Sequence, residues 1–412
     1  MMQILNAVCC GLDVHKQSVT ACLLTQGAQG RTVREFRTFS TMTSGLRELA
    51  QWLEAAGCRQ VALESTGVYW KPVYNVLERQ CEELLLVNAQ HIKQVPGRKT
   101  DMKDAEWIAQ LLQHGLLRGS FVPPVEVREL RELTRYRKTL IQQRANQCNR
   151  IQKLLEAGNV KLASVASDVL GVSGWQMLQA LAAGQTDPAQ LAEFARGRLR
   201  KKIPQLIQAL EGALSETQRW LLGEELSQIT QLDEAIGRLD AKVEQLSAPF
   251  VPAIQTLRQI PGVNRRIAEV IISEIGVDMS RFPTAANLAS WAGLCPGNHL
   301  SAGKRQSGKP RPGNRWLRGT LIEAGWAAAR TKNTYLASFY SRVARRRGVK
   351  KACLATAHAI LRTAHLLLSH PDLQYHDLGP DYFEKRGRDE LKRRLLRQLH
   401  SLGVQVTVHN AA

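Results

Sequence analysis

Several features that mark other classes of protein are missing from this sequence. No apolar run reaches the roughly 20 residues that cross a bilayer, and the first residues do not combine a basic segment with an apolar signal core. The eight cysteines include no C-x-x-C pair and no metal-ligand spacing, and Cys9 and Cys10 are neighbours in an apolar stretch. We therefore expect reduced, mostly buried thiols in a cytoplasmic protein with no membrane partner.

Acidic residues are scarce relative to basic ones. The chain has 36 Asp and Glu against 56 Lys and Arg, which gives a net charge of +20. The excess is concentrated in residues 127–153, with eight basic residues against two acidic ones, and in residues 291–350, with thirteen against one. The expected partner is nucleic acid, because neither block carries the bulky apolar face of a helix that lies on a membrane.

Against this basic background, two carboxylates end apolar segments. Asp13 follows the run from Ala7 to Leu12, and Glu64 follows Val61–Leu63. Both segments are expected to be buried strands. Acidic side chains are seldom buried unless they are paired or bind a metal, so both positions are candidates for a site.

Two more carboxylates, Asp101 and Asp104, belong to an expected helix. Their spacing of three places them on one face of that helix. An acidic first turn capped by Thr100 or Asp101 would require the same residues, so this pair alone does not distinguish a cap from a site. Together with Asp13 and Glu64, however, the pair predicts a four-carboxylate site for a divalent metal, Mg²⁺ or Mn²⁺.

The N-terminal pattern predicts strands first and then alternating helices and strands. The expected strands lie within residues 7–14, 19–23, 32–41, 61–64 and 84–87, and the expected helices are one that Ser44 caps and Gly57 ends, one at 69–80, and the Asp101 helix. This order favours a mixed α/β sheet with an antiparallel edge and both faces covered. Glu64 would then lie at the carboxyl end of a strand, where open α/β sheets place their sites, with Gly67 easing the following turn.

The middle of the chain is expected to be helical. Residues 127–157 predict one long basic helix, followed by shorter helices separated at Gly171, Gly174 and Gly184. Pro204 is expected to open another long helix, with apolar residues at heptad spacing over 226–246. This seam suits packing within the chain or a coiled coil with a second copy.

The C-terminal part contains two segments suited to nucleic acid. Residues 257–268, with Pro261-Gly262, are similar to half of a helix-hairpin-helix whose amides hold a DNA phosphate, and a structural turn is the alternative. Residues 293–313 are expected to form a long basic loop in which Ser301 or Ser307 is a candidate nucleophile, although the residues alone favour simple DNA binding. The expected nucleic-acid contacts are Arg265, Arg266, Lys304, Arg305, Lys309, Arg311, Arg315 and Arg318.

These patterns divide the chain into four parts. Residues 1–126 form the metal-binding α/β domain, 127–249 a helical linker with the heptad seam, 250–370 a mainly α domain with the serine loop, and 371–412 a basic tail. In the third part, helices are expected at 315–345 and 350–368.

Nearly the whole chain resembles the insertion-sequence transposases of the IS110 family, in particular its IS1111 branch. Gly11–Lys16, Leu63–Trp70 and Lys99–Ala105 are similar to the Asp-Glu-Asp-Asp motifs of that family. Ile260–Gly262 and Gly293–Gly303 are similar to motifs of its C-terminal transposase domain.

The resemblance implies a RuvC-like, RNase H-fold N-terminal domain in which Asp13, Glu64, Asp101 and Asp104 hold metal. It further implies that Ser301 attacks DNA to form a covalent phosphoserine, with Ser307 as second choice. A structured RNA from the element would guide the reaction by pairing with donor and target DNA. Two protomers would complete one active site in a homodimer or homotetramer, associated with the nucleoid of a bacterium.

Two other functions are compatible with the motifs. A nuclease of Holliday-junction-resolvase type would use the same carboxylates with metal-activated water, and Ser301 would only bind phosphate. A nucleic-acid-binding protein without catalysis would gain from losing the four carboxylates, so their presence argues against it.

Overall fold

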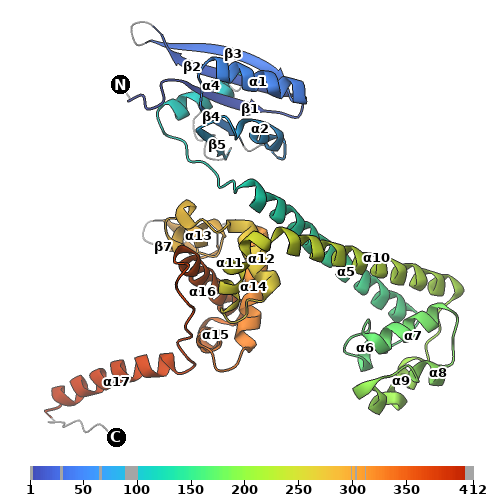
Figure 1. Cartoon of the computed structure of the whole chain (residues 1–412). Helices are drawn as coiled ribbons and strands as arrows, with labels where there is room; N and C mark the ends of the chain where they lie inside the picture. Colours follow the sequence, from blue (N-terminus) through green and yellow to red (C-terminus); the bar gives the residue numbers. More distant parts are fainter. Residues whose placement is uncertain are drawn as a thin grey trace. The chain divides into compact units, whose positions relative to one another are not determined.

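The structure, a computed structural model, describes residues 3–27, 31–64, 67–88, 101–297, 299–301, 304–310 and 312–403. Within this range, the side chains at 101, 299–301, 304–307 and 387–391 lie outside the description. The chain forms two compact units, Met1–Val122 and Pro123–Ala412, and each is described by itself (Figure 1).

The first unit is built on a five-stranded mixed sheet. Its strands are β1 (Cys9–Val14), β2 (Ser18–Gln26), β3 (Thr32–Ser40), β4 (Gln60–Glu64) and β5 (Glu83–Val87), in the order β3-β2-β1-β4-β5. The β1–β2 and β2–β3 pairs are antiparallel, whereas β1–β4 and β4–β5 are parallel. The predicted mixed sheet with an antiparallel edge is confirmed.

Helices cover both faces of this sheet. On one face, α1 (Thr43–Ala55) and α2 (Trp70–Leu77) pack against residues such as Leu12 and Leu63. On the other face, α4 (Asp101–Gln113) packs against Cys9 and Ala62. Alternate residues of each strand point to opposite faces, so every second strand residue enters one of two separate apolar clusters.

The predicted cap of α1 is wrong. Met42 occupies the N-cap position and makes no side-chain capping bond, and Ser44 lies inside the first turn. The Oγ of Ser40 instead accepts a hydrogen bond from the Met42 amide and so closes the turn between β3 and α1. Gly57, with φ of +62°, follows the end of α1 as expected.

The second unit begins with a long antiparallel helical hairpin. Its helices are α5 (Val125–Ala157) and α10 (Glu216–Leu246), which lie side by side (Figure 1). Between them come α6 (Leu162–Val165), α7 (Val172–Ala182), α8 (Pro188–Ala192), the 3₁₀ helix η2 (Gly197–Lys202) and α9 (Ile203–Ala209). These short helices enclose an apolar core of their own with the ends of α5 and α10.

Two predicted helix boundaries in this region are wrong. Pro204 lies in the first turn of the short α9, and α10 begins only after Ser215, whose side chain and Gln218 form a capping box. Gly174 lies inside α7, where a Cβ would overlap the backbone carbonyl of Val169. This glycine therefore permits close packing and does not end a helix.

The heptad seam packs within the chain. Leu226, Ile229 and Val243 are buried in contact with the rest of the unit, while Leu232 and Ile236 remain half-buried. Of the two interpretations of the seam, the structure contains the intramolecular one. Pairing with a second copy stays a prediction.

The rest of the second unit is mainly helical. It contains η3 (Ala248–Phe250), α11 (Val251–Arg258), α12 (Arg265–Ile275), η4 (Met279–Arg281), α13 (Ala285–Trp291), the strands β6 (His299–Ser301) and β7 (Lys304–Ser307), α14 (Arg315–Arg330), α15 (Tyr335–Arg347), α16 (Val349–Ser369) and α17 (Tyr382–Ser401).

Two expectations for this region are corrected. The predicted irregular loop at 293–313 contains a β-hairpin, because β6 and β7 pair antiparallel. The predicted helix at 315–345 is two helices, because Asn333 adopts φ of +58° and Thr334 caps α15 with its side chain.

Within the described residues, α16 is the one helix long and apolar enough in composition to cross a membrane. Its apolar residues pack against α14, α15 and α13, as in the core helix of a bundle. All eight cysteines are free thiols and five are buried, which confirms the expectation from their spacing. Burial raises the pKa of Cys9, Cys22 and Cys58 to about 12, so these thiols stay protonated.

Candidate functional site

The register of the sheet brings Asp13 and Glu64 to the same end of two neighbouring strands. In the parallel pair β1–β4, Leu12 lies opposite Leu63, and the next residue of each strand is Asp13 and Glu64. Adjacent strands lie about 4.8 Å apart. The two carboxylate positions are therefore neighbours at the carboxyl edge of the sheet.

Both carboxylates belong to the sheet face that α4 covers. Leu12 and Leu63 enter the apolar cluster on the α1 side, whereas Cys9 and Ala62 enter the cluster with α4. Because strand residues alternate between faces, Asp13 shares the face of Cys9, and Glu64 shares that of Ala62.

Helix α4 runs antiparallel to β1 along this face. The Asn6 side-chain amide donates to the carbonyl of Leu112 at 2.8 Å, and the Cys9 thiol donates to that of Ala109. Two residues further along β1, Gly11 lies against the backbone of Ala105, so close that a Cβ would overlap it. This progression brings the first turn of α4 to the level of Asp13.

That first turn carries Asp101 and Asp104. Asp104 is partly buried, and the Asp101 side chain lies outside the description, as does Thr100, the proposed cap. The fold therefore brings four backbone positions with carboxylates to one end of the sheet: two from strand ends and two from α4.

Asp13 is the most enclosed of the carboxylates described at this end of the sheet. It is 5% exposed, and its Oδ2 lies 3.1 Å from Nε2 of His15, in the turn that follows β1. Among the described side chains, no three Asp, Glu, His or Cys residues lie close enough together to hold a metal ion. The side chain of Asp101 is not among those described. The carboxylate oxygens suit a hard cation such as Mg²⁺, and a complete set requires Asp101.

The serine candidates lie on the hairpin of the second unit. Ser301 is the last residue of β6 and pairs with Lys304, while His299 pairs with Ser307. The two serines are thus on different strands. The side chains of Ser301, Lys304, Arg305 and Ser307, and all of Arg311, lie outside the description.

The two ends of the hairpin segment meet at its base. Gly313 packs so tightly on the backbone of Ala292 and Gly293 that a Cβ would overlap it. The amide of Asn314 donates to the carbonyl of Trp291 at 3.3 Å. The segment carrying Ser301 is therefore a closed loop whose base is held by backbone contacts.

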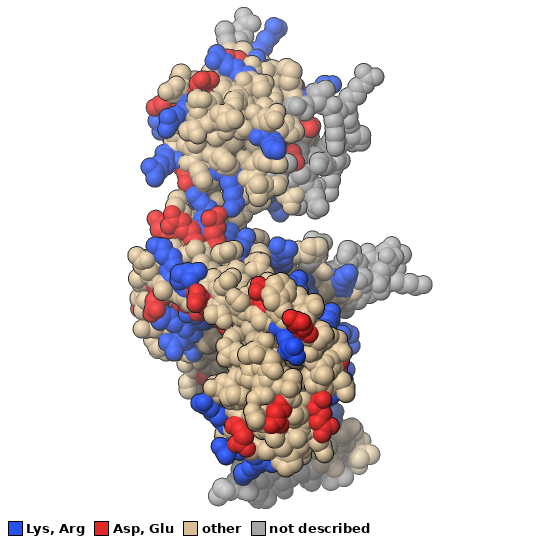
Figure 2. All heavy atoms as spheres, turned by 90° about the vertical axis from the view of Figure 1, so that its right-hand side faces the viewer, with Lys and Arg blue, Asp and Glu red and all other residues tan. Residues whose placement is uncertain are grey.

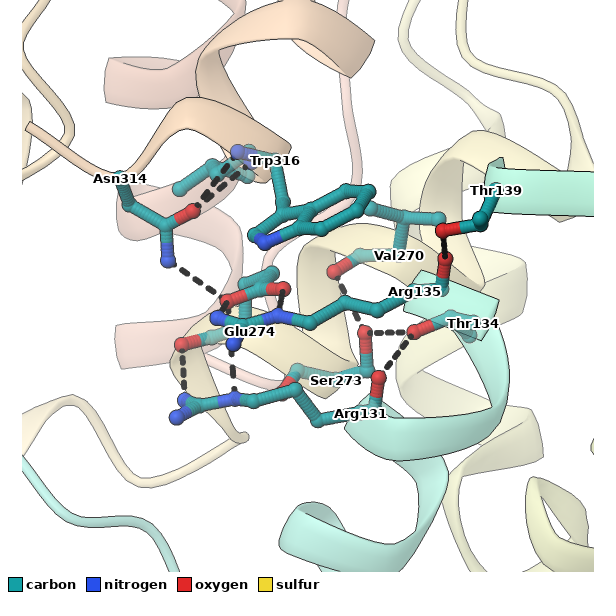
Figure 3. A network of polar contacts seen from close by, with 10 residues as sticks. Arg131, Thr134, Arg135, Thr139, Val270, Ser273, Glu274, Asn314 and Trp316 are labelled. Carbon is teal, nitrogen blue, oxygen red and sulfur yellow. Dashed lines mark hydrogen bonds and ion pairs between the residues drawn. The ribbon is translucent and has the colours of Figure 1, made fainter. Parts of the chain in front are cut away.

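A buried polar network anchors this base (Figure 3). Glu274 of α12 is fully buried, and its carboxylate accepts two hydrogen bonds of 2.7 Å from Arg135 of α5 and one of 2.6 Å from Asn314. The Oδ1 of Asn314 also caps α14. Arg131 donates to the carbonyls of Ser273 and Glu274.

The network links α5, α12 and α14 at the base of the segment that carries Ser301. Burial lowers the pKa of Arg131 to about 10, which the charge of Glu274 opposes, so the guanidinium remains charged at neutral pH. Sequence reasoning missed Glu274, although it interrupts the apolar run Ile271–Ile275 just as Asp13 interrupts its strand. Asn314 gave no comparable signal.

Two of the eight predicted nucleic-acid contacts are engaged in ion pairs within the protein. Arg265 pairs with Glu244 and Glu269, and Arg266 pairs with Asp240 and Glu269. The Pro261-Gly262 turn before them packs on α14, where a Cβ at Gly262 would overlap the backbone of Ala324. Their role in DNA binding stays a prediction.

Figure 2 shows that acidic side chains lie among the Lys and Arg side chains on one face of the molecule.

The remaining predicted contacts lie around the start of α14. Arg315 stacks on the Trp316 ring, 4.9 Å from its centroid, and is exposed. Arg318 is half-buried, and Lys309 is exposed. These three residues flank the base of the Ser301 segment on its C-terminal side.

Comparisons with known proteins define the class. A family model for DEDD-type transposases matches residues 10–159, and a model described as "Transposase IS116/IS110/IS902 family" matches residues 254–341. Together they cover more than half of the chain and contain all four carboxylates and Ser301. The chain therefore belongs to the IS110 family of transposases.

Two curated relatives agree with this assignment. The chain is 31% identical over 255 residues to the "Insertion element IS110 uncharacterized 43.6 kDa protein" of Streptomyces coelicolor, which covers 56% of this chain and 61% of the relative. It is 30% identical over 274 residues to the "Insertion element IS116 uncharacterized 44.8 kDa protein" of Streptomyces clavuligerus, covering 57% and 66%. The matches thus span about two thirds of each relative or less.

Proposed function

We propose that the protein is a DNA transposase that cuts and rejoins DNA strands for the movement of an insertion sequence. The observation that carries this proposal is the meeting of Asp13, Glu64 and the first turn of α4 at one end of the sheet. The N-terminal unit would be RuvC-like, and the chain would belong to the IS1111 branch of its family.

The carboxylates of Asp13, Glu64, Asp101 and Asp104 would hold the divalent metal. Bound Mg²⁺ or Mn²⁺ would supply Lewis-acid stabilisation of charge on the phosphate oxygens and on the leaving oxygen. The protein's own contribution is placement, since the tight Gly11–Ala105 contact fixes α4, and with it Asp101 and Asp104, relative to β1. His15 would keep Asp13 oriented.

Ser301 is the proposed nucleophile. Its Oγ would form a bond to the phosphorus of a DNA phosphodiester while the bond from phosphorus to a deoxyribose oxygen breaks. The hydroxyl proton leaves Ser301, and the departing oxygen gains a proton. Rejoining reverses this exchange with a different deoxyribose hydroxyl, so no external energy source is required.

The partners complete the proposal. DNA is the substrate, and a structured RNA encoded by the element would select donor and target by base pairing. A homodimer or homotetramer would combine the carboxylates of one protomer with the Ser301 loop of another. The protein would act in the bacterial cytoplasm at the nucleoid.

A nuclease remains the second candidate. The engagement of Arg265 and Arg266 in internal ion pairs leaves the carboxylate end of the sheet as the best-defined chemical feature, and carboxylates alone suffice for metal-assisted hydrolysis. In this case water attacks phosphorus, and Ser301 only contacts the phosphate.

The deciding experiment incubates labelled element-junction DNA, the element's RNA and Mg²⁺ with wild type, Ser301→Ala and Asp13→Asn. We expect a protease-sensitive protein–DNA adduct on a denaturing gel with wild type alone. Asp13→Asn should bind DNA normally and give neither adduct nor cut ends. Free ends from both wild type and Ser301→Ala, without an adduct, would show that water and not Ser301 attacks the phosphate.

A further inference from the structure

The cations of the two basic blocks differ in how far they form ion pairs within the protein. Five of the eight cations in residues 127–153 are paired with acidic residues of α10, α12 or α14. The pairs are Arg131 and Arg135 with Glu274, Arg137 with Asp240, Lys138 with Glu323, and Arg144 with Asp233. Most of the charge of α5 is therefore used inside the protein.

The end of the second block is free of such pairing. Where α15 ends and α16 begins, five exposed cations lie within seven residues: Arg345, Arg346, Arg347, Lys350 and Lys351. We call these residues the α15–α16 corner. None of them makes an ion pair with an acidic residue in the described part of the chain.

The two helices that form the corner supply no acidic partner either. Neither α15 nor α16 contains an Asp or Glu. Of the acidic side chains on neighbouring elements, Glu323 of α14 pairs with Lys138, and Asp381 pairs with Lys385. Glu384 of α17 is exposed and makes no ion pair with the corner in the described part of the chain. Asp377 accepts hydrogen bonds from the Tyr375 hydroxyl and two backbone amides.

This arrangement is unfavourable for the protein alone. The five like charges repel one another, and Lys350 and Lys351 lie in the first turn of α16, where the helix dipole disfavours cations. The alternative explanation, that cations in the last turn of a helix stabilise it, applies to Arg345–Arg347 only. An exposed group of charges that is unfavourable for the protein alone indicates a surface that binds a partner.

We propose that the α15–α16 corner binds the phosphate backbone of duplex DNA. This inference rests on the proposed DNA-processing function and adds a surface that lies beyond residues 10–159 and 254–341, the parts that match the family models. The corner has no aromatic side chain on which unpaired bases could stack, so it suits a duplex better than a single strand. Exposed flexible cations contact phosphates without reading sequence.

The test compares two variants with equal losses of charge. The first is Arg346→Gln/Arg347→Gln/Lys350→Gln in the corner. The control is Arg198→Gln/Arg200→Gln/Lys201→Gln on η2, where the cations are also exposed. Binding of each full-length protein to a fluorescent random-sequence DNA duplex is measured by anisotropy over a range of salt concentrations, without Mg²⁺.

For the corner variant we expect about tenfold weaker binding near 0.1 M salt. The slope of log affinity against log salt should flatten by about 2 to 3, since each phosphate contact contributes about 0.9. The η2 control should keep the wild-type slope. Single variants Arg346→Gln and Lys350→Gln, each flattening the slope by about 1, give the same answer if the triple variant unfolds.

Three outcomes would overturn the proposal. Equal losses in the corner and η2 variants would mean that only net charge matters, and an unchanged slope would mean that the corner makes no contact. Loss of binding to a structured hairpin RNA, with duplex binding intact, would assign the surface to RNA. Because this binding assay needs no cleavage, free ends without a Ser301 adduct in the experiment with Mg²⁺ would refute the serine mechanism and leave this inference standing.

Discussion

At the scale of single residues, Gly11 determines how closely α4 approaches the sheet. It lies in the middle of β1, and its missing side chain leaves room for the backbone of Ala105 and Ala109. Asp13 is two residues along the same face of the strand, and Asp101 is one turn before Ala105. The distance between these carboxylates therefore depends on a contact in which neither takes part.

We expect Gly11→Ala to abolish DNA cleavage and to lower stability. The added methyl would force α4 away from β1, and overpacking of this kind costs about 1–3 kcal/mol. Thermal unfolding and the cleavage assay measure the two effects. Gly237→Ala is the matched control, because nothing lies within 4 Å of a Cβ there and alanine favours the helix by about 0.5–1 kcal/mol. Wild-type cleavage by Gly11→Ala would show that the placement of the carboxylates does not depend on this contact.

Asp13 and Glu64 could be placed from the sequence because each ends a short apolar run. Strand alternation and the rule for strand ends in α/β sheets then fix the edge and the face. Asn314 could not be found in this way. Its amide is useful only because the segment from Gly293 to Gly313 closes on itself, and that closure depends on glycine contacts between residues far apart in sequence.

At the scale of elements, Glu274 joins helices that are distant in the chain. Its carboxylate connects α12 with Arg135 of α5 and with Asn314, which caps α14. The fully buried charge is compensated by bidentate and amide hydrogen bonds, as buried charges require. The base of the Ser301 segment is therefore fixed to the long hairpin by one side chain.

Replacement of Glu274 by Gln should lower the free energy of unfolding by about 2–3 kcal/mol, because it removes the fully buried counter-charge of the half-buried guanidinium groups of Arg131 and Arg135. Chemical denaturation of the full chain measures this loss. Glu323→Gln is the control, since its pair with Lys138 is 57% exposed on the acidic side and should contribute less than about 1 kcal/mol. Similar small losses in both variants would show that the buried pairs add little net stability.

Element boundaries that depended on turns were predicted least well. Helix periodicity located α5 and α10, but α9 and α10 are separated where Gly212 packs on the backbone of Gly158 and Asn159. Likewise, the composition of 293–313 predicted an irregular loop, and the β6–β7 hairpin forms through backbone pairing that requires no apolar pattern.

At the scale of the whole molecule, the net charge of +20 overstates the charge available to DNA. Much of the excess on α5 is balanced by Asp233, Asp240, Glu274 and Glu323, which the sequence places 80 or more residues away. Composition therefore predicts a polyanion partner as a class but cannot say which block would meet it. Only the fold separates structural cations from exposed ones.

This separation has a measurable consequence for the α5–α10 hairpin. We expect Arg137→Gln/Arg144→Gln to reduce stability by about 1–2 kcal/mol, since both ion pairs are partly exposed and together hold α5 against α10. The salt slope of duplex binding should stay at its wild-type value, because neither guanidinium is available to a phosphate. A slope that flattens by about 2 would mean that these arginines leave their acidic partners when DNA binds. The hairpin would then be part of the DNA surface, and its ion pairs would compete with the substrate.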